Sequence, residues 1–400
     1  MANSLLTISQ ITRKAALTLH QKLNLIGNMN RGYDDAYAQT GAKIGDTLRI
    51  RLPNEYVVRS GISMSAQDTT ETKVDLVVNN VKGVDLSFTS QELALSLDEF
   101  TDRIIDPAMS VLATNVESDV YTNLYKQVYN LIDGDAAAFA FTHTSSARQV
   151  LTEGLAPPAK RSCILSPAHT TKFLNDTKGL FNAPENISEQ FREGRLGRIQ
   201  GMDFYENTVF ADHLTGTALK ATTYTVNGAV TDNGSAAVTV ATGATTFKKG
   251  DVFTVANCFR VHPETKVSTG VLQQFVVGAD YAGGAGSLTF APAIYTTTGR
   301  QNVTAGGLPN GSAITKVGAG ANEYLNGSLA FYRDAFAFAT ADLPLPDGTD
   351  KASRAVVDGI SVSMVRDFTI SDRSFPCRLD VLYGYAAVRP QLAVRIHADG

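Results

Sequence analysis

Histidine and cysteine are the residues whose spacing would most directly reveal metal or nucleophilic chemistry, and here their spacing indicates neither. The six histidines include no H-x-x-x-H or H-E-x-x-H pair, so the sequence places no two imidazoles on one helix face as metal ligands. Cys163, Cys258 and Cys377 are far apart and form no C-x-x-C pair. We therefore predict three reduced thiols, no metal site and no disulfide framework.

Motifs for nucleophilic or nucleotide chemistry are also missing from the sequence. It has no G-x-S-x-G elbow, no G-x-x-x-x-G-K-[ST] loop and no G-x-G-x-x-G that opens a helix after a strand. The glycine-rich segment Ala282–Gly286 lies between two short predicted strands, as a turn would. Acidic residues at 34–35 and 98–102 fall in a loop and at a helix start, where they complement the helix dipole. We predict no catalytic residues, no cofactor and no enzyme.

Composition favours a soluble chain with much neutral surface. The 400 residues are 44% hydrophobic and only 18% charged, against a typical charged share of about 25%, which leaves surface available for contacts with other chains. A net charge of -4 and a pI near 5.9 argue against a dedicated nucleic-acid binder. The N-terminus has no signal-peptide pattern, and no run reaches the roughly 18 apolar residues of a membrane span. We therefore expect a cytosolic protein without a membrane partner.

The stretch from Thr217 to Gly320 interrupts the helical patterning around it and is rich in Thr, Gly, Ala and Val. Its segments "TYTVNGAV", "AAVTVA", "GDVFTVA", "GVLQQFVVGA" and "GSLTFAPAI" are each typical of a short strand bounded by turn residues. Asn227-Gly228 and Asn233-Gly234 are pairs that type I′ turns favour. We therefore predict an all-β module, either a barrel or a Greek-key sheet, inserted into another domain.

Before this module the pattern predicts an arm and an extended loop. Residues 4–30 have weakly amphipathic helical spacing and could pack on a neighbour or on their own core. Thr47–Arg51 alternates as a strand, and a second extended pair follows at 71–80 and 82–89. The polar stretch 59–70 is too long for a tight turn. We predict a two-stranded arm that either folds back on its own domain or reaches a neighbouring subunit.

The strongest helical signal begins at Asp106-Pro107, where Asp can cap free N–H groups and Pro fits the first helical position. Apolar residues then recur at every fourth position from Ala108 to Val128, which predicts one long helix.

An α/β pattern flanks the β module on both sides. Upstream we predict a strand around Cys163–Leu165, a helix from Pro167 to about Lys178, a helix through "ISEQFREG" and a strand "FYENTVF". Downstream, "SMVRDF" and "LDVLYG" alternate well enough to be neighbours in one sheet.

Several stretches, in this order, match one known kind of protein. They are "KIGDTLRIRLP", "LSLDEFTDRIIDPAMSVLATNVESDVY", "SCILSPAHTTKFLN", "FREGRLGRIQGMDFYENTVFADHLTG", "FKKGDVFTVANCFRVHPETKVSTGVLQQFVV" and "CRLDVLYGYAAVRPQLAVRI". Together they resemble the major capsid proteins of tailed bacteriophages with the Hong Kong 97 fold, in the coat-protein type of short-tailed Salmonella phages. The resemblance covers nearly the whole chain. The excursion between Tyr224 and Val240 is shorter than that type carries, which leaves its contact with a neighbouring capsomer open.

The resemblance implies an α+β fold of the Hong Kong 97 capsid type with an inserted all-β barrel. The expected segments are 1–45 as N-terminal arm, 46–90 as extended β-hairpin loop and start of the peripheral domain, 91–130 as its spine helix, 131–216 as first part of the axial domain, 217–320 as inserted barrel, 321–380 as second part of the axial domain, and 381–400 as C-terminal return strand.

The function implied is self-assembly into pentamers and hexamers of an icosahedral shell that encloses double-stranded DNA without sequence-specific binding. Expected partners are copies of the chain, a scaffolding protein and a portal, and the expected location is the virion, after assembly in the host cytoplasm. An encapsulin-like nanocompartment is the alternative, although it should lack the inserted barrel. A secreted β-rich adhesin or hydrolase fits less well, since no signal segment is present.

The residues proposed for contact between subunits lie in the extended loop. We expect the loop to overlap an adjacent subunit, with Arg59 placed to meet a carboxylate there. The candidate contact residues are Arg51, Arg59, Met64, Asp68 and Glu71.

Overall fold

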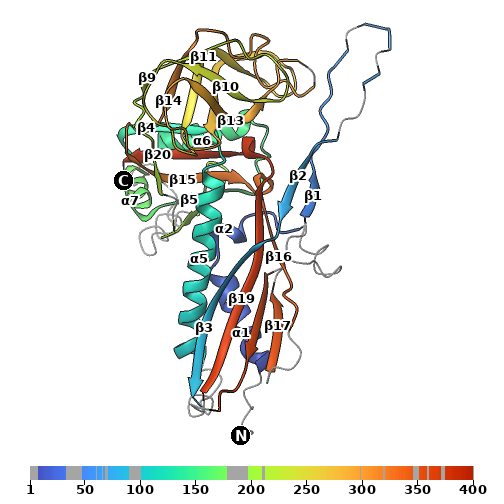
Figure 1. Cartoon of the computed structure of the whole chain (residues 1–400), viewed down its shortest axis with the longest axis vertical. Coiled ribbons are helices and arrows are strands. Elements are labelled where there is room, and N and C mark those ends of the chain that lie inside the picture. Colours follow the sequence, from blue (N-terminus) through green and yellow to red (C-terminus); the bar gives the residue numbers. More distant parts are fainter. Residues whose placement is uncertain are drawn as a thin grey trace. The chain divides into compact units, whose positions relative to one another are not determined.

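The computed structural model has an α+β fold in which strands predominate (Figure 1). It describes residues 8–32, 47–59, 61–64, 66–67, 71–89, 101–177, 197–209, 212–297, 299–318, 320–345, 351–357, 360–370 and 374–399. The chain divides into two compact units. The first contains Met1–Ile50, Lys73–Val120 and Phe336–Val388, and the second contains Arg51–Thr72, Tyr121–Ala335 and Arg389–Gly400.

Among the residues that the structure describes, a five-stranded antiparallel sheet forms the centre of the first unit. Its strands are β3 (Asn80–Thr89), β16 (Phe336–Ala341), β17 (Lys351–Val357), β18 (Ile360–Arg366) and β19 (Ser374–Ala387). Strand β19 is central because it pairs with β3, β16 and β18. The prediction that "SMVRDF" and "LDVLYG" are neighbours is confirmed, since Ser363 pairs with Asp380 and Arg366 with Cys377.

Two N-terminal helices belong to the same unit, α1 (Ile8–Lys22) and α2 (Asn24–Gly27). The apolar face of α1, which includes Ile11, Ala15 and Leu19, is buried, and the helix contacts β17 and β18. The sequence allowed residues 4–30 to pack either on a neighbouring subunit or on the core of their own chain, and the structure shows the second arrangement.

The long helix α5 (Asp106–Tyr125) follows a short π-helical turn, η2 (Thr101–Ile105). Within the first unit, α5 lies beside β3 and β19 (Figure 1), where Lys82 Nζ donates to the Asn115 backbone oxygen at 2.8 Å and Tyr383 Oη to Asp119 Oδ2 at 2.8 Å. The predicted start is confirmed, but the apolar stripe runs past the helix end. The Val128 N–H donates to the Tyr125 carbonyl, a three-residue turn that ends the helix.

The first predicted strand is confirmed as β1 (Thr47–Arg51), which pairs with β2 (Lys73–Val77) in a separate two-stranded sheet. The expectation that segments 71–80 and 82–89 form a pair with each other is wrong. Strand β3 instead pairs with β19 from Asn80 to Thr89, so its backbone groups are satisfied by a distant partner.

The second unit contains a β-barrel and a host part, which is the remainder of that unit. Among the described residues, the host part is built on a seven-stranded sheet. Its strands are β4 (Leu131–Ala138), β5 (Arg161–Leu165), β6 (Arg198–Ile199), β7 (Met202–Glu206), β8 (Asp212–Leu214), β15 (Tyr324–Tyr332) and β20 (Ala393–Asp399), with helices α6 (Phe141–Glu153) and α7 (Pro167–Thr177) and short turns η3 (Arg333–Ala335) and η4 (Pro390–Leu392). The predicted strand at 163–165 and the helix from Pro167 are confirmed. The helix predicted through "ISEQFREG" lies outside the described residues.

The predicted β module is a closed barrel in the second unit, formed by β9 (Ala221–Val226), β10 (Ser235–Ala241), β11 (Val252–Val261), β12 (Ser268–Val277), β13 (Gly286–Ile294) and β14 (Ala313–Val317). Its strand order is β10-β13-β12-β11-β14-β9. Aromatic rings fill the interior, and Phe275 and Phe290 have ring centroids 4.9 Å apart. Strand β14 closes the barrel and is the one that sequence reasoning missed.

The type I′ turns predicted at Asn227-Gly228 and Asn233-Gly234 are wrong. Both pairs lie in the connection from β9 to β10, and only the glycines have positive φ, 90° and 89°. The Asn227 N–H still donates to the Thr239 carbonyl at 2.8 Å, so this residue continues the ladder. The Asn233 side chain accepts the Thr296 N–H at 2.9 Å, a contact with a distant segment that fixes the turn.

Candidate functional site

The extended loop that connects β1 to β2 is the first candidate site. Its base continues the hairpin, since the Leu52 N–H donates to the Thr72 carbonyl at 2.8 Å. Farther out, the Gln67 side-chain amide donates to the Val57 carbonyl and accepts the Val57 N–H at 2.9 Å. Beyond the end of the regular strands, the Gln67 side chain thus pairs with the Val57 backbone as a strand residue would.

Arg51 and Glu71 face each other across the base of this loop. Arg51 Nη1 lies 3.3 Å from Glu71 Oε2. Both side chains are exposed, so this ion pair contributes little to stability. The backbone hydrogen bond between Leu52 and Thr72 is what joins the two loop ends.

Arg59 and Met64 lie at the outer part of the loop. The Arg59 guanidinium donates to the carbonyl oxygens of Gly61 and Ser63. Met64 is 85% exposed. Asp68 lies outside the described residues, so the structure assigns it no place.

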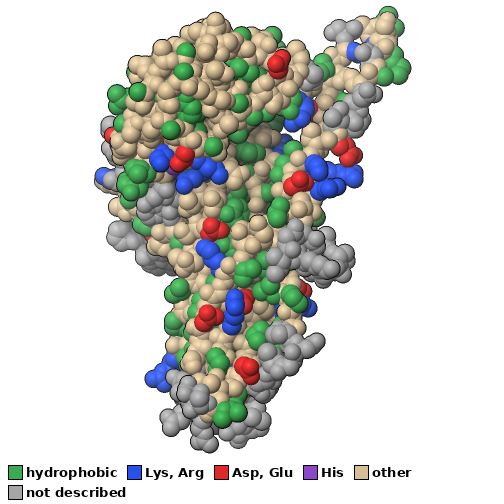
Figure 2. Space-filling view, in the orientation of Figure 1, with side chains coloured by type: hydrophobic (Ala, Val, Ile, Leu, Met, Phe, Trp, Pro, Cys, Tyr) green, Lys and Arg blue, Asp and Glu red, His purple; other side chains and the backbone are tan. Residues whose placement is uncertain are grey.

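Large apolar side chains concentrate on the outer part of this loop, as Figure 2 shows. Val58 is 89% exposed and Ile62 is fully exposed, and Tyr56 is also exposed. A chain rarely leaves adjoining apolar side chains in water unless another surface covers them. Sequence reasoning selected only Met64 of this group, although apolar residues within a stretch too short to form its own core were a usable signal.

The base of the loop is held against the barrel within the second unit. Lys266 Nζ lies 3.6 Å from Glu55 Oε2. Gly299 packs directly on the loop backbone, since a Cβ there would lie 2.5 Å from the Glu55 carbonyl oxygen. The loop therefore leaves the barrel from a defined point.

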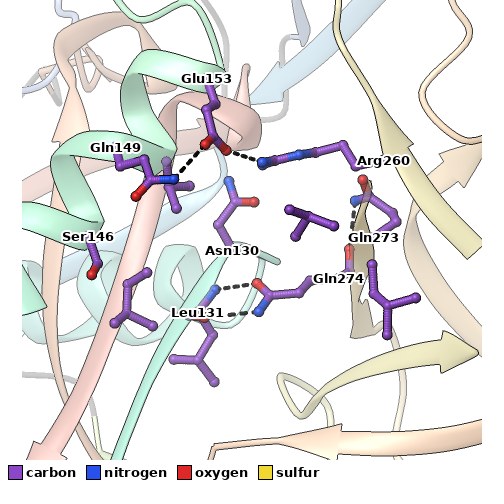
Figure 3. Close-up of a pocket in the computed structure, with 12 residues that line it drawn as sticks. Asn130, Leu131, Ser146, Gln149, Glu153, Arg260, Gln273 and Gln274 are labelled. Atoms are coloured by element: carbon purple, nitrogen blue, oxygen red, sulfur yellow. Dashed lines mark hydrogen bonds and ion pairs between the residues drawn. The ribbon is translucent and has the colours of Figure 1, made fainter. Parts of the chain in front are cut away.

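A pocket of about 240 Å³ in the second unit is the second candidate site. It lies between α6 and β4 on one side and β11 and β12 on the other (Figure 3). The Gln274 side-chain amide accepts the Leu131 N–H at 2.7 Å and donates to its carbonyl at 3.0 Å, and Arg260 pairs with Glu153. These polar groups bind the barrel to the host sheet, and none is set up as a nucleophile.

A histidine–serine hydrogen bond, a pairing that hydrolases use, occurs in the second unit but is enclosed. His169 Nδ1 lies 2.7 Å from Ser328 Oγ, and Nε2 lies 3.0 Å from the Ala398 backbone oxygen. His169 and Ser328 are fully buried, and burial lowers the pKa of His169. The ring stacks on Phe139 with centroids 4.5 Å apart. A substrate has no access, so the pair serves packing.

The three cysteine thiols are also enclosed. Cys163, Cys258 and Cys377 are free and buried, and burial raises the pKa of Cys258 and of Cys377 to about 12. Such thiols are protonated and inert near neutral pH. Within the described ranges, no group of three or more His, Cys, Asp or Glu residues could hold a metal ion. No helix in the part of the chain that the structure describes is long and apolar enough to cross a membrane.

Comparisons with known proteins assign the chain to a family. The family model described as "P22 coat protein - gene protein 5" matches residues 1–396. A comparison with curated proteins gives no match. Among solved structures, the chain is similar to Mycobacterium phage Che8, with 13% identity, coverage of 92% of this chain and 89% of that chain, and a TM-score of 0.45. It is also similar to the capsid of Ralstonia phage GP4, with 9% identity, coverage of 93% and 88%, and a TM-score of 0.44.

The class of protein is therefore a bacteriophage coat protein. The chain belongs to the P22 coat protein family, because the family model spans nearly its whole length. It is a major capsid protein that associates with copies of itself to form the shell of the virion. The encapsulin-like alternative is not better supported. Proteins of this family are structural.

Proposed function

We propose that copies of this chain form pentamers and hexamers of an icosahedral shell that encloses double-stranded DNA. Rings of identical subunits require heterologous interfaces, in which one face of a subunit meets a different face of the next. The observation that carries the proposal is the group of exposed apolar side chains at Val58, Ile62 and Met64 in a chain of a coat-protein family. The low share of charged residues, 18%, is consistent with a surface used largely for such contacts.

The extended loop from Arg51 to Glu71 is proposed to overlap an adjacent subunit. Burying one exposed side chain such as Ile62 in that contact is worth about 2 kcal/mol. The same loop would bring Arg59 to a carboxylate of the neighbour, in exchange for its present bonds to backbone oxygens. A net charge of -4 is consistent with an inner wall that does not trap packaged DNA.

The experiment that tests this role deletes Gly61–Asp68 from the full chain. We expect a soluble, folded monomer that no longer forms shells, because the apolar tip is lost while both units keep their cores. Sedimentation and electron microscopy measure assembly, and circular dichroism measures folding. Particles of normal size and yield from this variant would contradict the proposal.

A point variant makes the same test sharper. Replacing Ile62→Ser should raise the concentration needed for assembly about 30-fold, which corresponds to about 2 kcal/mol per contact. The matched control is Val267→Ser, which removes a similar exposed side chain from the barrel and should have a smaller effect. Equal effects of the two substitutions would show that exposed apolar area in general, and not this loop, drives assembly.

A scaffolding protein and a portal complete the proposed assembly, which would take place in the host cytoplasm. We also propose the seven-segment division of the chain given above, with 217–320 as the inserted domain. Co-expression of the chain with its genomic neighbours, followed by mass spectrometry of purified particles, identifies these partners. Closed shells of uniform size that contain only this chain would remove the need for a scaffold.

A further inference from the structure

Buried polar groups in the second unit tie the barrel to its host at the two chain connections. The chain enters the barrel through residues 215–220 and leaves it through 318–323. Lys316, on β14, is only 2% exposed, and its Nζ donates to the Ala218 carbonyl at 2.9 Å and to the Gly320 carbonyl at 2.6 Å. One ammonium group thus holds both connections together.

Asp251 performs a similar role from the barrel turn that precedes β11. Its fully buried carboxylate accepts the His213 Nε2–H at 2.8 Å, the Gly216 N–H at 3.0 Å and the Lys248 N–H at 2.8 Å. His213 belongs to host strand β8, Gly216 to the entering connection and Lys248 to the barrel. The carboxylate therefore joins three segments at one point.

A fully buried arginine supplies the compensating charge from host strand β20. Arg395 Nη1 donates to the Gly250 carbonyl at 2.9 Å, and its guanidinium lies 4.9 Å from the centre of the Tyr125 ring. Two host residues thus hold the barrel turn at 248–251. Arg395 binds the backbone of this turn, and His213 binds its Asp251 carboxylate.

We propose that His213, Asp251, Lys316 and Arg395 form a pH-sensitive latch between barrel and host, closed while His213 is neutral and loosened when His213 takes up a proton. In the closed latch, the neutral imidazole donates one hydrogen bond to the ionised Asp251. A proton on the second ring nitrogen would place another positive charge in a buried site that already holds two cations.

The charged groups around His213 support this direction. Burial lowers the pKa of His213, and the positive charges of Arg395 and Lys126 lower it further, against the opposing effect of Asp251. Burial by itself would raise the pKa of Asp251, but the hydrogen bonds from His213 and the Lys248 N–H, with the charge of Lys316, lower it below its usual value. Asp251 therefore stays ionised where His213 titrates.

The sign of the pH dependence follows from linkage. A histidine exposed by opening titrates near pH 6.5, whereas the enclosed His213 resists protonation to lower pH. Opening therefore takes up a proton, and the closed latch is fully favoured above about pH 6.5 and weakens as the pH falls through that value. For one proton, the opening equilibrium constant should rise between pH 7.5 and 5.5, and by no more than about tenfold.

Amide hydrogen exchange of the full-length chain, measured at pH 7.5 and 5.5 and corrected for the intrinsic exchange rate, tests this. The unassembled protein should lose protection in segments 212–218 and 316–323 at the lower pH, by no more than about tenfold. His213→Gln keeps an N–H donor for Asp251 but does not titrate, so this variant should lose little protection at the lower pH. His262→Gln is the matched control and should behave like wild type, because the His262 ring accepts hydrogen bonds from the Glu264 and Thr265 N–H groups of its own barrel loop.

Two results would overturn the latch: unchanged protection of these segments in wild type, or an equal loss in His213→Gln. If that variant does not fold, nitrogen-15 NMR of the wild-type histidines still decides. In the closed latch the pKa of His213 must then lie below its ordinary value, and the junction must lose protection as His213 takes up its proton. A His213 that titrates at its ordinary pKa without any loss of protection contradicts the proposal.

Discussion

At the scale of single residues, tight packing in the second unit depends on positions where no side chain fits. Gly327, on β15, is the sharpest case, because a Cβ there would lie 2.0 Å from the phenol oxygen of Tyr125. Tyr125 is itself fully buried and supports Arg395, so it has little room to move. Its neighbour Tyr121 donates to the Gly327 backbone oxygen at 3.1 Å, which fixes the strand as well.

We predict that Gly327→Ala lowers the free energy of unfolding by about 1–3 kcal/mol, the range found for overpacked cores. Urea unfolding followed by circular dichroism measures this change. Gly306→Ala is the matched control, because a Cβ there meets nothing within 4 Å. Equal stability of the two variants would mean that the Tyr125 ring adjusts freely, contrary to its burial.

At the scale of elements, local alternation was enough to predict β1 and the pairing of β18 with β19, and the Asp106-Pro107 pair was enough to predict the start of α5. Contacts between segments far apart in the sequence were not predictable in this way. The partner of β3 is β19, nearly three hundred residues later, and no pattern within 80–89 indicates that choice. Strand β14 was missed because "AITKV" is short and follows a long irregular connection.

The candidate site shows the same limits. The loop and its two strands were predictable because alternation stops and resumes on either side of a polar stretch. The latch was not, since His213, Asp251, Lys316 and Arg395 lie in four different segments that only the folded unit brings together. The Asn-Gly turns were predicted wrongly because Asn233 bonds to the distant Thr296, a contact that no local rule contains.

The barrel as an element leads to a further prediction. Its core, which includes Tyr224, Phe253 and Phe290, comes entirely from residues 218–314 and forms one cluster. We expect the fragment Thr217–Gly320 to fold alone, with less stability than in the full chain because His213 and Arg395 are absent. Circular dichroism and amide exchange check this, and an unfolded fragment would show that the barrel depends on its host.

At the scale of the whole molecule, this chain is a shell subunit, and we infer that its function is spread over its surfaces. Family membership establishes a coat protein, and the described residues supply an exposed apolar loop and a barrel fixed to its host by buried polar groups. In such a protein, a stable unit and an exposed contact surface must coexist. The loop tip is therefore expected to contribute to assembly while adding little to the stability of the monomer.

The most direct test of this account is negative-stain electron microscopy of the expressed chain, alone and together with its genomic neighbours. We predict closed shells or tubular polyheads for the wild-type chain, and neither for the variant that lacks Gly61–Asp68. A wild-type chain that remains monomeric under both conditions and shows hydrolytic activity would contradict the account.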